Sequence, residues 1–184
     1  MTMSYLRGAL LIATPSLLDP NFERTVVLIA EHNEEGAMGL VLNRPSEITI
    51  AQAAPELEGL AESDEAVYVG GPVQTSGIIV LAEFDQPELA GVLVEDDLGF
   101  VDGASDLIDV AAATRRARVF AGYTGWGPGQ LESEIGREDW IVESSAERRE
   151  IFTDAPAGLW SAVLERKGGQ FALLARMPED PSVN

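Results

Sequence analysis

The sequence predicts an α+β fold built from many short strands and a few helices. Short apolar runs rich in β-branched residues recur along the 184 residues, separated by turns of glycine, proline and asparagine. Amphipathic segments suited to helices occur between some of these runs, but they do not alternate strictly with the strands as in a doubly wound fold. The pattern indicates roughly eight strands and three or four helices.

The first half of the chain is dominated by strand-like segments. Residues 8–13 (GALLIA) and 25–31 (TVVLIAE) are nearly continuous apolar runs, which predict strands covered on both faces. The segment 36–45 (GAMGLVLNRP) follows the turn EHNEEG and is expected to pair with the second strand as a hairpin that ends at Pro45. Residues 48–60 predict a short helix with Thr49 as its N-cap.

The middle of the chain continues this pattern of short strands. Residues 67–73 (VYVGGPV) predict a strand that ends in a tight turn, because the glycine pair permits positive φ and the following proline fixes φ. Residues 78–83 (IIVLAE) predict another strand, and 89–103 predict two further short strands around Asp96 and Asp97.

A helix is expected after these strands, followed by the longest block of glycine-rich sequence. The expected helix runs through LIDVAAATRR (107–116), with Ser105 or Asp106 as its cap, and its apolar stripe is formed by Leu107, Ile108, Val110 and Ala111. Its C-terminal end would hold Arg115 and Arg116. Residues 117–126 (ARVFAGYTGW) then predict a strand, and Pro128 suits the first turn of a helix that puts Leu131 and Ile135 on one face.

The C-terminal third predicts a strand, two helices and a last strand. Residues 140–144 (WIVES) form the expected strand, and ERREIF and PAGLWSAVLERKG form the expected helices, with Gly168 as the stop. Residues 171–175 (FALLA) predict a final strand. We expect one domain over 1–184, with its core at 6–175 and a disordered tail at 177–184.

Composition narrows the class of protein. Hydrophobic residues make up 46% of the chain and charged residues 23%, as in a globular domain. No run approaches the roughly 18 apolar residues of a membrane span, and the N-terminal apolar run is too short for a signal peptide, so we expect a cytoplasmic protein with no membrane contact. Cysteine is absent, which excludes disulfides, thiol catalysis and cysteine-ligated zinc.

The net charge is strongly negative. The chain has 12 Lys and Arg against 31 Asp and Glu, a formal charge of −19, and no basic residue occurs between Arg44 and Arg115. Affinity for nucleic acid comes mainly from Lys and Arg contacts to phosphates, so direct nucleic-acid binding is disfavoured. The acidic surface is either a solvated, self-repelling face or a docking face for a basic protein partner.

Three segments resemble a known family. The runs GALLIATPSLLDPNFERTVVLIAEHNEEGAMGLVLNRP, VYVGGPV and GYTGWGPGQLESEIGREDW are similar to the signature blocks of the AlgH/YqgE family, also called UPF0301 or DUF179, in the same order from about residue 6 to about residue 175. The resemblance implies a bacterial cytosolic domain with a mixed β-sheet folded into a pseudo-barrel and helices packed outside. The family is associated with transcriptional control of alginate production and has no established biochemical activity.

The same segments define a candidate binding cleft. Their glycines and turn residues are specialised, whereas no catalytic set is present, so we interpret the chain as a non-enzymatic binding or regulatory module that contacts a small ligand or a protein partner. The cleft would form where VYVGGPV, EHN and GYTGWGPGQ approach one another. Its candidate residues are His32, Asn33, Asn43, Arg44, Gly70, Gly71, Pro72, Thr124, Gly125, Trp126, Gly127, Gln130 and Glu134.

An enzymatic alternative rests on His32, the only histidine. An unrecognised hydrolase or transferase could use this imidazole, placed in the hairpin turn, with a carboxylate such as Glu31 or Glu134. Ser76 is the nearest candidate nucleophile, but it lacks the nucleophile-elbow pattern. The alternative to a catalytic role is that His32 has a purely structural role in the turn.

Other motifs have both a binding and a structural interpretation. The turn from Gly127 to Gln130 could present backbone N–H groups to an anion, or it could pack tightly while Trp126 fills the core. Arg44 is expected to pair with an inward carboxylate or to anchor a substrate.

An acidic turn could hold Ca²⁺ or Mg²⁺, but its spacing does not match a calcium loop; we expect no metal and no cofactor. The acidic turn consists of Asp96, Asp97, Asp102 and Asp106.

Overall fold

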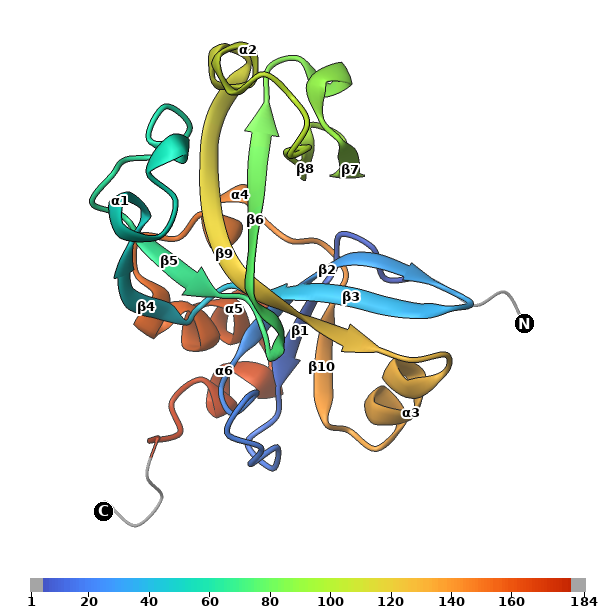
Figure 1. Ribbon diagram of the computed structural model, residues 1–184. Helices are drawn as coiled ribbons and strands as arrows, with labels where there is room; N and C mark the ends of the chain where they lie inside the picture. Colours follow the sequence, from blue (N-terminus) through green and yellow to red (C-terminus); the bar gives the residue numbers. More distant parts are fainter. Residues whose placement is uncertain (1–4, 180–184) are drawn as a thin grey trace.

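The protein folds around one mixed sheet (Figure 1). The structure is a computed structural model that describes residues 5–179, and within them ten strands form a sheet whose main path is β10-β1-β2-β3-β9-β6-β8-β7. The strands are β1 (Leu10–Ala13), β2 (Val26–Asn33), β3 (Gly36–Val41), β4 (Pro45–Thr49), β5 (Ala66–Val69), β6 (Val73–Phe84), β7 (Val92–Glu95), β8 (Leu98–Phe100), β9 (Thr114–Trp126) and β10 (Trp140–Glu143).

Helices connect and cover the strands. The α-helices of the described part are α1 (Ile50–Ala53), α2 (Leu107–Ala112), α3 (Gln130–Gly136), α4 (Arg148–Ile151), α5 (Leu159–Lys167) and α6 (Gln170–Leu174). Three short 3₁₀ helices are η1 (Pro55–Leu57), η2 (Pro87–Leu89) and η3 (Pro156–Gly158). Within residues 5–179, no helix combines the length and the apolar composition needed to cross a bilayer.

The long strand β9 pairs with three other strands and connects β3 with β5 and β6 in the sheet. Figure 1 shows β9 as a curved strand that runs from α2 to α3. It pairs antiparallel with β6 along most of its length, parallel with β5 at Phe120 and Ala121, and antiparallel with β3 at its C-terminal end. The α+β class with a mixed sheet is therefore confirmed. The sheet does not close into a barrel, because its path ends at β10 and at β7.

The two faces of the N-terminal strands bury different hydrophobic clusters. On one face, Leu10, Ile12 and Leu28 pack against α5, whose buried Trp160 donates its indole N–H to the Ala13 carbonyl at 2.9 Å. On the other face a second cluster includes residues of α3 and the segments around it. This cluster contains Leu11, Val27, Ile29, Trp126, Leu131 and Trp140. Successive side chains of a strand point to opposite faces of the sheet. Because each face of these strands packs against a hydrophobic cluster, apolar residues stand at consecutive positions.

The helix expected at 107–116 is shorter than the sequence suggests. Asp106 caps α2 as expected, with its carboxylate accepting the Ile108 N–H at 2.9 Å. The expected apolar stripe is buried at Val110, but its member Ile108 is 80% exposed. Arg115 and Arg116 lie on β9 and not at the helix end, because the chain turns into the strand at Thr114.

The segment FALLA was wrongly expected to be a strand. It lies in α6, since Gly168 (φ 76°) and Gly169 (φ 57°) redirect the chain after α5. Phe171 and Leu174 then contact the core at a spacing of three residues, which is the spacing of one helix face. Of the tail expected to be disordered, 177–179 are described and Met177 accepts a hydrogen bond from Arg24, whereas 180–184 lie outside the described residues.

The expected turn at Gly70 and Gly71 is held between β3 and β9. The Gly70 carbonyl accepts the Val41 N–H at 2.9 Å, and the Gly70 N–H donates to β9 at 2.9 Å. A Cβ on Gly70 would overlap a carbonyl of β9, and a Cβ on Gly71 would overlap the backbone of Tyr123. Glycine is therefore required here by the close approach of two backbones.

Candidate functional site

A single carboxylate fixes the glycine-rich segment at the end of β9. The indole N–H groups of Trp126 and Trp140 both donate to one oxygen of Glu134, at 2.8 Å and 2.9 Å. The two rings meet edge to face with centroids 6.2 Å apart, and both are buried. A buried indole N–H needs an acceptor, and here one side chain of α3 supplies it to both rings. Trp140 was not among the predicted site residues, although it lies in the same short segment as Trp126 and Glu134.

The turn that precedes α3 is closed by side chains of the helix. The Gly127 N–H donates to the Gln130 side-chain oxygen at 3.0 Å, and the Gln130 amide nitrogen donates to Glu134 at 3.2 Å. The N-cap is Gly129 with φ 72°, a left-handed conformation that favours glycine. Because the Gly127 N–H is already paired, this turn does not present it to an anion.

His32 is held in one tautomer by two partners. Its Nδ1 accepts the Leu6 N–H at 3.0 Å, so its Nε2 bears the proton that is donated to Glu132 at 2.7 Å. Only 3% of the His32 side chain is exposed. His32 lies on β2 and not in the turn, and its carboxylate partner is neither Glu31 nor Glu134. Ser76, the candidate nucleophile, is exposed on β6, and the strands β3 and β9 lie between β6 and β2. His32 and Ser76 are therefore not on neighbouring strands.

The link between His32 and Glu132 predicts an acid-sensitive contribution to stability. The Glu132 backbone N–H and the His32 imidazole both donate to the Glu132 carboxylate, and this lowers its pKa below the usual value of 4.5. A carboxyl group whose pKa is lowered on folding stabilises the fold above its unfolded pKa, and the stabilisation disappears as the pH falls through the lowered pKa.

We therefore expect Glu132→Gln to reduce the free energy of unfolding at about pH 7, by no more than about 1 kcal/mol because the carboxylate is partly exposed. The difference from the wild type should shrink as the pH falls below 4.5. Urea unfolding at neutral and acidic pH measures both values. Glu138→Gln, at an exposed residue of the next turn, is the control; a Glu132 effect that does not change with pH would contradict this interpretation.

Asn43 and Arg44, which follow β3, bind the loop between β1 and β2. The Asn43 side chain accepts the Val26 N–H at 3.0 Å and donates to the Arg24 carbonyl at 2.9 Å. Arg44 donates to the carbonyls of Pro20 (2.6 Å) and Glu23 (2.9 Å). The expected ion pair with an inward carboxylate is replaced by these backbone contacts.

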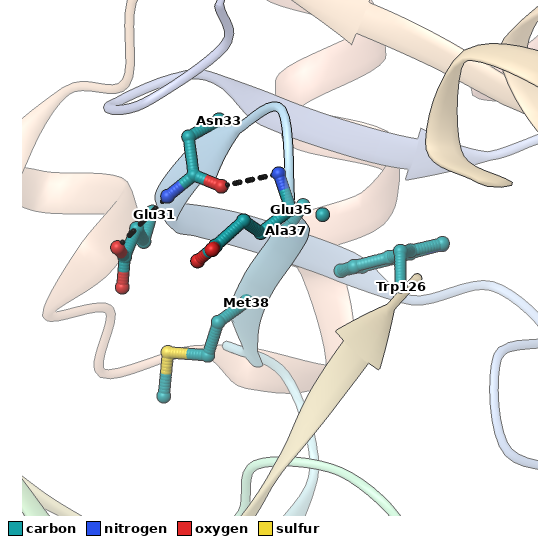
Figure 2. A pocket seen from close by; sticks show the side chains of 7 residues that line it. Glu31, Asn33, Glu35, Ala37, Met38 and Trp126 are labelled. Atoms are coloured by element: carbon teal, nitrogen blue, oxygen red, sulfur yellow. Dashed lines mark hydrogen bonds between the residues drawn. The ribbon is translucent and has the colours of Figure 1, made fainter. Parts of the chain in front are cut away.

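A small depression lies at the tip of the β2–β3 hairpin (Figure 2). Its volume is about 200 Å³, and its lining residues are Glu31, Asn33, Glu35, Gly36, Ala37, Met38 and Trp126. Asn33 orders the tip, because its side chain donates to Glu31 at 3.2 Å and accepts the Glu35 N–H at 2.8 Å. The lining contains two carboxylates and no basic side chain.

The register of the hairpin decides which atoms reach this depression. Glu31 pairs with Met38, whereas His32 pairs with Ala37, which in turn pairs with Trp126. Side chains alternate between faces, so the Trp126 indole lies on the same face of the sheet as His32, opposite to Glu31 and Met38. Figure 2 shows Glu31 and Met38 on one side of the hairpin and Trp126 on the other.

The structure brings together part of the predicted cleft. Two of the three segments meet, because the Gly70–Gly71 turn packs on the β9 backbone. EHN lies on β2 and is separated from β9 by β3. Of the predicted residues, however, only Asn33 and Trp126 line the depression. Other predicted residues take structural positions: Gly70, Gly71 and Thr124 are buried, Gln130 and Glu134 bond within α3, and Pro72 is exposed.

Three of the four acidic residues considered as a cation site form local hydrogen bonds or ion pairs. Asp97 forms ion pairs with Arg115 and Arg148, at 3.0 Å to the latter. Asp102 and Asp106 each accept the N–H of the residue two positions later. In the described part of the chain, no group of three or more His, Asp or Glu side chains is arranged to hold a metal ion.

Comparisons with known proteins agree on one family. The AlgH-like family profile (DUF179) matches residues 10–172. A UPF0301 protein of Streptomyces coelicolor is 41% identical, covering 99% of this chain and 97% of that protein. A UPF0301 protein of Mycobacterium tuberculosis is also 41% identical, covering 96% of this chain and 90% of its own length.

Two solved structures share the fold. The crystal structure of a Corynebacterium diphtheriae protein superposes with a TM-score of 0.84 at 26% identity, covering 95% of this chain and 94% of that one. The solution structure of the AlgH protein from Pseudomonas aeruginosa superposes with a TM-score of 0.70 at 34% identity, covering 97% of each chain.

Proposed function

The chain belongs to the AlgH-like family, and we propose that it acts as a cytoplasmic, non-enzymatic binding module that takes a basic side chain of a protein partner into the depression at the tip of the β2–β3 hairpin. The observation that supports this most is the pair of carboxylates, Glu31 and Glu35, that line a recess without any basic residue. The guanidinium or ammonium group of a partner would neutralise both.

The size of the depression favours a side chain over a small molecule. Pockets for small ligands have volumes of about 300–1,000 Å³. The depression is about 200 Å³, which suits the end of one Arg or Lys side chain of a larger partner. The hairpin tip around it is ordered by the Asn33 hydrogen bonds, so little conformational entropy is lost on binding.

Charge supports the same choice of partner. The formal charge of −19 attracts a basic protein at long range and repels nucleic acid, so a regulatory role of this protein would act through protein contacts. The enzymatic alternative has less support, because both ring nitrogens of His32 are hydrogen-bonded within this chain and neither is available to a substrate.

We expect a blocked arginine tripeptide to bind the protein and to bind the double variant Glu31→Gln/Glu35→Gln roughly tenfold or more weakly, because charged hydrogen bonds are lost. Isothermal titration calorimetry at low ionic strength measures both affinities. The matched control is Glu56→Gln/Glu88→Gln, which changes the net charge equally at two exposed residues of 3₁₀ helices. If both double variants weaken binding equally, the peptide binds through the general negative field, and the depression is not the site.

A further inference from the structure

A larger groove lies at the outer edge of β10, away from the depression. Its volume is about 740 Å³, and it shares no lining residue with the depression. The lining combines an apolar centre with two basic side chains and one acidic one. It consists of Thr14, Ser16, Ile135, Arg137, Glu138, Trp140, Ile141, Val142, Lys167, Gln170, Phe171 and Leu174.

β10 is an edge strand whose backbone faces this groove. Among the described strands it pairs only with β1. The Asp139 carbonyl accepts the Thr14 N–H at 3.0 Å, so the alternation of an antiparallel ladder directs Ile141 and Glu143 to β1 and turns the backbone groups of Trp140 and Val142 outward. An edge of this kind is a template for a further strand.

The groove extends around both faces of the edge. Ile135 of α3 belongs to the cluster that contains Trp140 and Val142, whereas Phe171 of α6 packs with Ile141 in the cluster on the opposite face. An added strand would continue the sheet between these two walls, and its alternate side chains would contact α3 and α6 in turn.

Lys167 occupies the position that a partner strand would take. Its ammonium donates to the outward Val142 carbonyl at 2.9 Å and lies 3.6 Å from Glu143. A backbone N–H of an added strand would replace this donor and free the ammonium to bind a carboxylate. Arg137, at the other end of the groove, is 61% exposed and pairs with Asp139 at 2.9 Å.

We propose that the outer edge of β10 binds an extended segment of a partner protein as an added strand, with apolar side chains in the groove and a carboxylate at Lys167 or Arg137. Charge complementarity selects this occupant: the groove is lined by two basic side chains and one acidic one, in a chain with 12 basic and 31 acidic residues. A second copy of the chain is disfavoured, because two molecules of formal charge −19 repel each other.

The test is selection of a random hexapeptide library displayed with free C-terminal carboxyl groups, followed by fluorescence polarisation with the enriched peptides. We expect apolar residues at alternate positions together with a carboxylate. Val142→Pro removes an outward N–H and none of the backbone groups paired with β1, and an edge strand tolerates proline. It should weaken binding at least roughly tenfold. Phe171→Ala should weaken it similarly, whereas Leu173→Ala, an exposed neighbour on α6 that does not line the groove, should not.

Amide exchange gives a readout that does not depend on whether Val142→Pro folds. In the wild type, bound peptide should slow exchange at Trp140 and Val142, whereas Ile141 and Glu143 are already paired with β1. No enrichment, binding that is unaffected by a folded Val142→Pro variant, or unchanged exchange at Val142 would each overturn the proposal. A concentration-dependent dimer that buries β10 would overturn it in favour of self-association.

Discussion

Replacing Gly71 by alanine is expected to destabilise the protein by at least about 3 kcal/mol, a large fraction of the roughly 5–15 kcal/mol by which ordinary domains are stable. The added Cβ would overlap backbone atoms of Tyr123, and backbone atoms cannot move aside as a flexible side chain can. The turn would have to separate from β9 and would lose the hydrogen bonds at Gly70. Urea unfolding followed by circular dichroism measures the change.

Gly136→Ala is the matched control for this prediction. Gly136 is the last residue of α3, and a Cβ there would meet nothing within 4 Å. Alanine in a helix is favoured over glycine by about 0.5–1 kcal/mol, so this variant should be as stable as the wild type or slightly more stable. Equal stability of Gly71→Ala and Gly136→Ala would show that the packing of the turn on β9 is not required.

Removing the carboxylate of Glu134 should have the second-largest effect. In Glu134→Ala both indole N–H groups lose their acceptor while the rings remain buried, and each unsatisfied donor costs about 1–3 kcal/mol. We expect a loss of about 3 kcal/mol in the free energy of unfolding, together with a change in tryptophan fluorescence as Trp126 and Trp140 move.

Glutamine at the same position separates hydrogen bonding from charge. Glu134→Gln keeps one carbonyl oxygen that can accept from the indoles, so its loss should be smaller, about 1 kcal/mol. The control is Glu165→Ala, at an exposed residue of α5, which should change stability by less than about 0.5 kcal/mol. If Glu134→Ala is as stable as this control, the carboxylate does not hold the two rings.

The periodicity of the sequence was sufficient for most of the fold. The buried strands β1 and β2, the hairpin to β3, the short strands β7 and β8 and the Asp106 cap were all predicted from local patterns. FALLA was assigned to the wrong class because a five-residue apolar run has no period of its own. Its helix depends on the turn that Gly168 and Gly169 make after α5, and on packing against the core.

The candidate site could be predicted less well, because it depends on sheet register. His32 and Glu132 are 100 positions apart, and only the pairing of β2 with β3 and of β3 with β9 brings them together. The same register places the Trp126 indole away from the face of Glu31. The one signal available was that two tryptophans flank Glu134 in a single short segment, and a buried indole N–H requires an acceptor.

The most direct test of the proposed function is a ¹⁵N–¹H correlation spectrum recorded while the blocked arginine tripeptide is added. The largest shifts should occur at the backbone amides of Glu35 and Gly36 and at the side-chain amide of Asn33, which bonds to Glu31. The indole of Trp160, buried against β1, should not shift. If the largest shifts instead fall in the acidic stretch from Glu95 to Asp109, the hairpin depression is not where a basic partner binds.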